Sequence, residues 1–225
     1  MPQVRPRGPA APLLLLLLAC AAPVAAPTRD PLASLAGAPP AAGSDEAKAD
    51  LAIVLWEQRT RTADDVRRAR EGVELGLASF AEALGPGFDP ARHPRTEALL
   101  RAVGEECRRA TGGLKREHLR PRPFAADGRV QPAIAREESP SFPSGHAARG
   151  VVFARVLAEL APARAEALRL RGLGVGYDRV IGGVHWPSDV EASQRLAPAL
   201  ADRLLADPAW RARIEEVRAA EWAGR

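Results

Sequence analysis

The sequence predicts an all-α protein, a single-domain helical bundle. Its composition is rich in Ala, Leu and Arg, which favour helices, and aromatic residues make up only 4% of the chain. Apolar residues recur at helical spacing, as in Val66, Val73, Leu77, Phe80 and Leu84. Capping residues, glycines and prolines separate such runs from one another. A chain of 225 residues is long enough for one domain of this kind with a sizeable core.

Segments that begin at a capping residue or a proline define the expected helices. We expect helices over residues 44–59, 62–84, 94–110, 144–160, 163–173, 187–200 and 210–222. Glycines end three of them, at residues 85–87, 112–113 and 172–176. Four prolines within residues 114–142 predict a long loop, and long ordered loops in compact domains are often functional. His93 and His118 are interpreted as loop histidines.

Residues 1–26 have the features of an export signal. Arg5 and Arg7 form its basic start, the apolar run Leu13–Leu18 forms its centre, and small residues up to Ala26 suit cleavage. A membrane span needs about 20 apolar residues, and this run is shorter. We therefore expect an exported protein, periplasmic or secreted, whose mature chain has no transmembrane segment.

A second interpretation of the leader involves Cys20. Residues 17–20 resemble a bacterial lipoprotein cleavage site, in which case Cys20 would carry a lipid anchor and hold the protein at a bacterial membrane. After the leader, residues 27–43 are rich in Pro, Ala and Gly and predict a flexible linker, and residues 44–225 form the predicted helical domain. Cys107 is expected to be a small buried apolar residue, so we expect no intrachain disulfide.

The charge pattern does not favour nucleic acid as a partner. The net charge of +4 includes two arginines of the leader, and the other arginines are interspersed with Asp and Glu along the predicted helices. The only lysines are Lys48 and Lys115, which singles out Lys115 in an Arg-biased chain. The sequence leaves open whether the protein is a homo-oligomer.

The stretch Pro143-Ser144-Gly145-His146 opens the helix that is predicted from residue 144. The first turn of a helix has backbone N–H groups without partners and the positive end of the helix dipole. Ser144, Gly145 and His146 could therefore present donors to a phosphate-sized anion. Gly145 lets an anion approach the backbone closely, and His146 can carry a proton near neutral pH. The simpler alternative is a helix cap made by Ser144 beside a histidine without function.

Two further segments accompany this motif in a fixed order. Lys115 precedes Arg122-Pro123 by six intervening residues, and Arg179, His185 and Asp189 are spaced by five and then three intervening residues. This three-part pattern resembles the signature of the bacterial class A nonspecific acid phosphatases, in the wider superfamily of type 2 phosphatidic acid phosphatases and vanadium haloperoxidases. The resemblance implies a helical bundle with its active site at helix ends and connecting loops, small phosphate monoesters as substrates, and no metal or other cofactor.

The residue types fit phosphate chemistry on physical grounds as well. A transferring phosphoryl group bears charge on several oxygens, and stabilising it without a metal requires fixed cations and N–H donors. Lys115, Arg122 and Arg179 can supply the cations, and the two arginines offer forked donors. Each of the three could instead be a solvated surface charge, which is the usual situation of such residues.

The two histidines of the motifs have complementary predicted roles. His185, held by the carboxylate of Asp189, would attack phosphorus and form a phosphohistidine. His146 would protonate the leaving alkoxide and later take a proton from water. Because His146 must start protonated and His185 neutral, we expect the best activity on the acidic side of neutrality. Alternatively, His185 and Asp189 are a structural pair, or they join His146 as zinc ligands, although the neighbouring cations disfavour a metal ion there.

One residue departs from the family pattern. The family usually has a small residue, most often Ser, before the arginine of the third segment, and here that position is Asp178. Its carboxylate could pair with Arg179 and hold it, or could repel a phosphate dianion. The alternatives to an acid phosphatase are a non-catalytic phosphate-binding protein, a lipid-phosphate phosphatase and a vanadate-dependent haloperoxidase.

Overall fold

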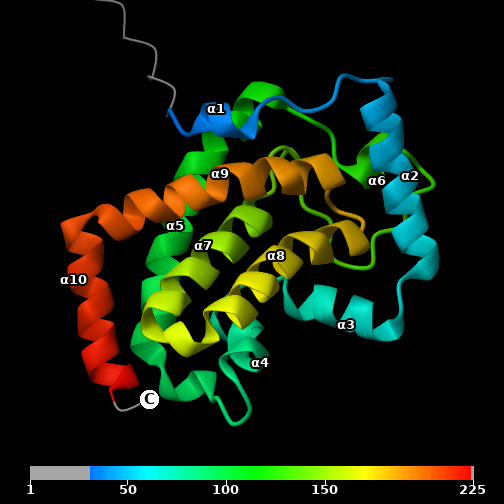
Figure 1. The fold of residues 1–225 in the computed structure, drawn as a ribbon. Helices are drawn as coiled ribbons and strands as arrows, with labels where there is room; N and C mark the ends of the chain where they lie inside the picture. Colours follow the sequence, from blue (N-terminus) through cyan, green and yellow to red (C-terminus); the bar gives the residue numbers. More distant parts are fainter. Residues whose placement is uncertain (1–30, 224–225) are drawn as a thin grey trace, which may run out of the picture.

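The computed structural model describes residues 31–223 (Figure 1). The predicted leader with Cys20 and the first part of the predicted linker lie outside the described residues. Within residues 31–223 every regular element is a helix, so the predicted all-α class is confirmed. None of these described helices is long and apolar enough to cross a membrane.

The helices differ widely in length. The longer ones are α2 (Asp45–Thr60), α3 (Ala63–Glu71), α5 (Pro94–His118), α7 (Gly145–Leu160), α8 (Ala165–Ile181), α9 (Pro187–Ala206) and α10 (Pro208–Val217). The short ones are α1 (Ala33–Ala36), α4 (Ala81–Leu84) and α6 (Pro123–Ala126). Turns of 3-10 helix lie at Leu77–Phe80, Pro90–Arg92 and Pro162–Arg164, and a π-helical turn, Arg218–Trp222, follows α10.

Side chains at the helix starts explain where several helices begin. Ser44 caps α2 and Ser144 caps α7, each by accepting a hydrogen bond from a backbone N–H of the first turn. Thr62 and Asp65 form a reciprocal capping box at α3. Pro187 stands at the first position of α9, where its missing N–H costs nothing. The predicted starts of these four helices are confirmed.

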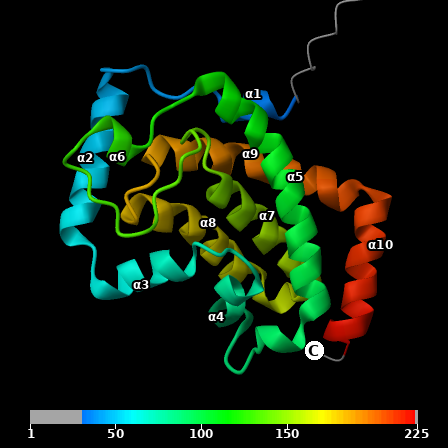
Figure 2. The ribbon, with the colours of Figure 1, turned by 180° about the vertical axis from the view of Figure 1, so that it is seen from behind.

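Helices α7 and α8 form an antiparallel pair at the centre of the bundle, with α5 and α9 packed against α7 (Figures 1 and 2). The pair approaches closely at Gly150 and Gly172, because a Cβ added to Gly150 would lie 2.5 Å from the carbonyl oxygen of Gly172. Helix α8 runs through its glycines to Ile181, so the turn predicted at residues 172–176 is wrong. Arg179 therefore lies on a packed helix.

Helix α5 is longer than the sequence analysis expects. Cys107, Thr111 and Leu114 are all buried, and their spacing continues one apolar stripe through the two intervening glycines. The predicted helix end at residue 110 is therefore wrong, whereas the predicted burial of Cys107 is confirmed. Lys115 consequently lies on the last turn of α5, and the loop starts only at Leu119, whose φ of 46° is left-handed.

The single helix predicted over residues 62–84 is also wrong. Helix α3 ends at Glu71, and a separate helical turn starts at Leu77. The carboxylate of Glu97 accepts the N–H of Leu77 at 2.8 Å, so this N–H is not available to continue the first helix. The intervening residues 72–76 form turns and bends, and the carbonyl of Val73 accepts from a side chain of α7.

The two histidines outside the motifs both take part in packing. His93, directly before α5, is buried and stacks on Phe88, with ring centroids 4.5 Å apart. His118 is the last residue of α5 and meets Phe142 edge to face, with ring centroids 5.0 Å apart. The interpretation as a loop histidine is therefore wrong for His118, which is helical, whereas His93 does lie in the short connection between a 3-10 turn and α5.

Part of the predicted linker is packed against the bundle. Helix α1 buries Ala33 and Ala36 in a cluster with Leu114, Phe142 and Leu196. The expectation of a flexible connector therefore does not hold for this short helix.

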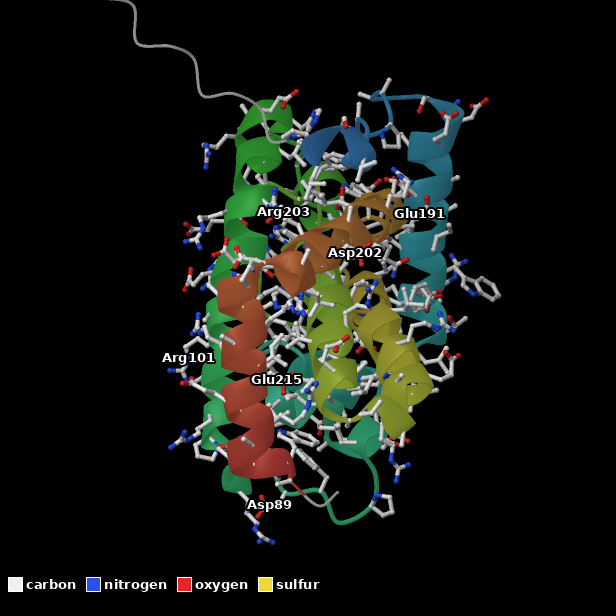
Figure 3. The ribbon with its side chains drawn as sticks, turned by 60° about the vertical axis from the view of Figure 1, so that its left-hand side comes forward. Asp89, Arg101, Glu191, Asp202, Arg203 and Glu215 are labelled. Carbon is white, nitrogen blue, oxygen red and sulfur yellow. The ribbon has the colours of Figure 1, made fainter. Side chains whose placement is uncertain are left out.

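The C-terminal helix packs back on the bundle as predicted. Glu221 accepts a hydrogen bond from the N–H of Thr96 at 2.9 Å, and the indole of Trp222 donates to the same threonine. Figure 3 shows α10 beside α5, with Arg101 and Glu215 extending from their outer faces. This side of the molecule carries mixed charges.

Candidate active site

The predicted site residues come from helix ends and loops that meet at one end of the α7–α8 pair. Lys115 is in the last turn of α5 and Arg122 directly precedes α6. Ser144 caps α7, which begins with Gly145 and His146. Arg179 is in the last turn of α8, His185 lies between α8 and α9, and Asp189 is in the first turn of α9. Figure 2 shows the loop between α6 and α7 crossing the region where α8 ends and α9 begins. The structure thus brings all the predicted residues into one region.

His185 is held by the carboxylate of Asp189. Its Nδ1 lies 3.2 Å from Oδ2 of Asp189, and the same oxygen accepts the N–H of Trp186 at 2.9 Å. The other ring nitrogen, Nε2, faces Nη1 of Arg122 at 3.3 Å. Burial, together with the charges of Arg122 and Lys115, lowers the pKa of His185 well below its usual value. His185 is therefore a neutral imidazole that donates from Nδ1 and has a lone pair on Nε2.

Two residues that the sequence analysis missed hold Asp189 in place. Arg120 donates from Nη1 to Oδ1 of Asp189 at 2.7 Å and to Oγ of Ser188 at 2.8 Å. Its Nη2 donates to Oδ2 of Asp50 on α2 at 2.7 Å. These groups are nearly buried, so the chain Asp50–Arg120–Asp189–His185 is a continuous buried network. The only feature of the sequence that could have pointed to Arg120 is its position near Arg122 of the motif, and no feature of the sequence points to Asp50.

The side chains of Arg122 and Arg179 are each only 2% exposed. Arg122 donates from Nε to the carbonyl of Ser139 at 2.8 Å and from Nη1 to the carbonyl of Val184 at 2.9 Å, so its position is fixed by backbone. Arg179 donates from Nη2 to Glu137, but its Nε and Nη1 have no hydrogen-bond partner among residues 31–223. Unpaired guanidinium donors in a buried place mark a site that an anion would complete.

Glu137 joins the two arginines and was missed by the sequence analysis. Its Oε2 lies 2.7 Å from Nη2 of Arg122, and its Oε1 lies 2.5 Å from Nη2 of Arg179. Burial alone would raise the pKa of Glu137, but the two guanidinium groups hold it at about 2. Its only signal in the sequence was its position in the loop before the Pro143-Ser144-Gly145-His146 motif.

Lys115 is the third cation of the site. Its Nζ donates to the carbonyl of Pro140. Burial, and then the charge of Arg122, lowers the pKa of Lys115 to about 8, whereas Asp189 and Glu137 act in the opposite direction. The ammonium is therefore protonated at neutral and acidic pH and adds one positive charge beside His185.

The start of α7 supplies a second imidazole. The N–H of Ser144 donates to the carbonyl of Asp189 at 3.0 Å, so it is not available to an anion and the expectation for this group is corrected. Gly145 and His146 keep the N–H groups that a first helical turn leaves unpaired. His146 Nε2 donates to the carbonyl of Val73 at 3.1 Å. Burial and the charges of two arginines lower the pKa of His146 well below its usual value.

Asp178 does not enter the site, and both expectations for it are wrong. Its carboxylate accepts from Nε of Arg68 at 2.9 Å and from Nη1 of Arg171 at 2.8 Å. Successive residues of a helix point in different directions, so Asp178 faces α3 while Arg179 faces Glu137. Asp178 therefore neither pairs with Arg179 nor faces an anion bound beside it.

Relatives of known name share this chain's sequence over most of its length. A non-specific acid phosphatase of Salmonella typhimurium is 32% identical over 170 residues, which cover 72% of this chain and 65% of that protein. An acid phosphatase of Zymomonas mobilis is 31% identical over 84% of this chain and 74% of its own length. The chain thus spans just under two thirds of the Salmonella relative.

The fold and the motif region have counterparts as well. A transmembrane PAP2 type phosphatidylglycerolphosphate phosphatase of Bacillus subtilis superimposes with a TM-score of 0.50 at 20% identity, over 86% of this chain and 95% of the other. This likeness concerns the fold alone. A family model described as the PAP2 superfamily matches residues 106–206, which contain all the predicted site residues. The chain therefore belongs to the PAP2 superfamily and, within it, to the bacterial non-specific acid phosphatases.

Proposed function

We propose that the protein is an acid phosphatase that hydrolyses small phosphate monoesters through a phosphohistidine at His185. The observation that carries this proposal is the environment of His185. Asp189 holds its imidazole ring, and the unprotonated Nε2 lies beside buried cations. Arg179 adds two buried donors that lack a partner among the described residues. A nucleophile next to an unfilled anion site is the arrangement that phosphoryl transfer requires.

In the first step, the lone pair on Nε2 of His185 attacks phosphorus, and the bond from phosphorus to the ester oxygen breaks. Protonated His146 gives its proton to the departing oxygen, so that an alcohol leaves. In the second step, neutral His146 takes a proton from a water molecule, whose oxygen attacks phosphorus and breaks the P–N bond. Inorganic phosphate leaves and His185 is restored as a neutral imidazole.

Side chains and backbone groups of the protein supply the positive charge that stabilises the transferring phosphoryl group. Lys115, Arg122 and Arg179 surround the proposed phosphate position, and the N–H groups of Gly145 and His146 add donors from the start of α7. A Cβ added at Gly145 would be in ordinary van der Waals contact with Oγ1 of Thr111 at 3.9 Å, so this turn is not tightly packed. These groups stabilise the phosphoryl oxygens without requiring a metal ion.

The zinc alternative is disfavoured because its three candidate ligands, His146, His185 and Asp189, already make hydrogen bonds within the protein. Nδ1 of His185 is taken up by Asp189, and both oxygens of Asp189 accept from Arg120 or from the backbone. His146 donates to Val73. Asp189 could bind a metal ion only by giving up these contacts, and the ion would lie beside three cations.

The protonation state of His146 determines how the proposed activity depends on pH. In the ligand-free protein its lowered pKa makes it neutral near pH 7. A bound phosphate ester brings negative charge and so raises the pKa of His146. His146 must be protonated and His185 neutral in the complex, which places the best activity on the acidic side of neutrality.

The named activity of the Salmonella and Zymomonas relatives supports the proposal. The export-type leader supports a periplasmic or secreted protein, and a lipid anchor on Cys20 is the alternative. Lipid-phosphate phosphatase and vanadate-dependent haloperoxidase activities rest on the shared superfamily alone. A non-catalytic phosphate-binding protein is the remaining alternative.

A single set of assays on the purified mature chain separates these possibilities. We expect hydrolysis of p-nitrophenyl phosphate at mildly acidic pH in the presence of EDTA, inhibition by orthovanadate, and no bromide oxidation by the vanadate-loaded protein. Rapid quenching and peptide mapping should find phosphate on His185. The variant His185→Ala should lose both turnover and the covalent phosphate.

The matched control is His93→Asn. His93 is also a buried histidine, but it lies at the opposite end of α5 from Lys115, about 33 Å away at 1.5 Å per residue. Its variant should keep turnover once folding is verified by circular dichroism. Phosphate binding without turnover by the unmodified protein would contradict the proposal and favour the non-catalytic alternative.

A further inference from the structure

Glu137 occupies the place where the proposed function requires a phosphate group. Its two carboxylate oxygens bridge Arg122 and Arg179, one oxygen to each guanidinium, at 2.7 and 2.5 Å. The arginine side chains are 2% exposed, whereas that of Glu137 is 34% exposed. The carboxylate therefore reaches into the site from the solvent side.

The bridge leaves the site incompletely filled. Glu137 satisfies only Nη2 of Arg179, and the buried Nε and Nη1 of that residue remain without a partner among residues 31–223. A tetrahedral oxyanion has more oxygens and, as a phosphate ester, more charge than a carboxylate. It can take over the contacts of Glu137 and also pair with the remaining donors of Arg179.

The carboxylate and a phosphate cannot occupy this place together. Two anions between the same two guanidinium groups would repel each other at short range in a poorly hydrated site. The side chain of Glu137 can move out of the site, because Glu137 lies in the non-helical stretch between α6 and α7. It also lines an open hollow of about 530 Å³ with Phe124 and Ser139.

We propose that Glu137 is an internal competitor for the phosphate site, an inference that rests on the proposed function. Its carboxylate fills the site in the free protein, leaves the site when substrate binds and returns as phosphate departs. It partly compensates the charge of the two buried guanidinium groups between turnovers, since an uncompensated buried charge is costly. It also weakens the binding of product, which favours the release of phosphate.

Competition differs in a measurable way from simple repulsion by a nearby charge. A competitor raises the Kd of every anion by the same factor, because the same carboxylate must be displaced each time. A fixed negative charge that stayed near the ligand would weaken a dianion more than a monoanion of the same shape. Sulfate and methanesulfonate are such a pair, and their charges do not change near neutral pH.

The experiment measures binding of inorganic phosphate, sulfate and methanesulfonate by isothermal titration calorimetry, with displacement titrations for the weak ligands. The variants are Glu137→Gln and, as the matched control, Glu138→Gln. Glu138 is the exposed next residue of the same loop, and its variant makes the same change in net charge. Should Glu137→Gln fold poorly, Glu137→Ala replaces it, and the phosphate dependence of the Tm replaces calorimetry.

We expect Glu137→Gln to lower the Kd of all three anions by a common factor of about tenfold or more, and Glu138→Gln to leave them nearly unchanged. The KM for p-nitrophenyl phosphate and the inhibition constant for phosphate should fall by the same factor. An unchanged Kd in Glu137→Gln would overturn the inference, as would a gain for sulfate that is much larger than the gain for methanesulfonate.

The outcomes also separate this inference from the proposed function. If the unmodified protein binds phosphate but does not turn over its ester, the binding data still decide the role of Glu137. If neither the unmodified protein nor Glu137→Gln binds any of the anions, the anion site itself is refuted and both proposals are overturned.

Discussion

The two imidazoles of the site are held in very different ways. His185 is fixed through Asp189, Arg120 and Asp50, a buried network that reaches across to α2. His146 has one hydrogen bond outside its own helix, to the carbonyl of Val73 in an irregular stretch after α3. Under the proposed mechanism, this difference makes His185 a preorganised nucleophile and His146 an adjustable acid.

This asymmetry has a physical reason. A nucleophile must be aimed at phosphorus, whose position is set by fixed cations, so rigidity at His185 lowers the barrier for every substrate. The leaving group differs from one ester to the next, and its acid must follow it. A weakly held His146 therefore suits a phosphatase of broad tolerance, and the predictions below test this contrast.

The largest effect is expected from Asp189→Asn. An amide can donate to Nδ1 of His185, which would move the proton to Nε2 and block the attack. We expect kcat to fall by about 10⁴-fold with little change in KM, since the wrong tautomer of a catalytic histidine costs about this much elsewhere. Steady-state kinetics with p-nitrophenyl phosphate measures it, and a change confined to KM would contradict the role.

A smaller effect, dependent on the substrate, is expected from His146→Asn. Loss of a general acid costs about 10²–10⁴-fold, and the cost grows with the basicity of the leaving oxygen. Hydrolysis of an alkyl phosphate should therefore suffer much more than hydrolysis of p-nitrophenyl phosphate. Equal losses for the two esters would show that His146 does not protonate the leaving group.

The third prediction concerns stability and pH. The folded-state pKa values of His146 and His185 lie well below the value of 6.5 expected for an unperturbed histidine. The unfolded chain therefore binds more protons than the folded chain as the pH drops below about 6.5, and the free energy of unfolding should fall. This contribution from the histidines is fully present above that pH.

Phosphate should reduce this loss, because it raises the pKa of His146 in the complex. The measurement is the Tm between neutral and mildly acidic pH, with and without inorganic phosphate. NMR titration of His146 assigns the effect to that residue. A pKa of His146 that stays unchanged in the presence of saturating phosphate would contradict its role as the acid.

The smallest effect is expected at Asp178, which lies next to Arg179 in sequence but outside the site. Asp178→Asn should lower the free energy of unfolding by about 1–2 kcal/mol, a value kept small because Arg68 and Arg171 are partly exposed. Its kcat/KM should stay within about twofold of the unmodified protein.

The matched control for this variant is Asp202→Asn. Asp202 pairs with Arg155 on the exposed surface of α9 (Figure 3), so its loss should cost less than about 0.5 kcal/mol. Chemical denaturation measures both variants. A large loss of activity in Asp178→Asn would show that this carboxylate reaches the site after all.

Local signals in the sequence predicted helix starts better than helix ends. Ser44, Thr62 and Ser144 act through hydrogen bonds within one turn, so three or four residues of sequence contain the whole interaction. The ends at residues 110 and 173 were misplaced because glycines were interpreted as stops. At Gly150 and Gly172 the absence of a side chain instead lets two helices touch.

The candidate site shows the same division. Lys115, Arg122, His146, Arg179 and His185 were predicted from motif spacing, since their chemistry is recognisable from residue type and order. Arg120, Asp50 and Glu137 were not, because each acts through a partner at least 15 residues away, such as Glu137 on Arg122. No short segment of sequence contains both members of such a pair.

The order of the residues by itself determined the helical class, the helix caps and the chemical groups available for phosphate transfer, because these depend on composition and on neighbours along the chain. Tertiary structure alone decided which way Asp178 faces, which residues hold Asp189 and what fills the space between Arg122 and Arg179. These features depend on contacts between distant segments, and such contacts exist only once the helices have packed.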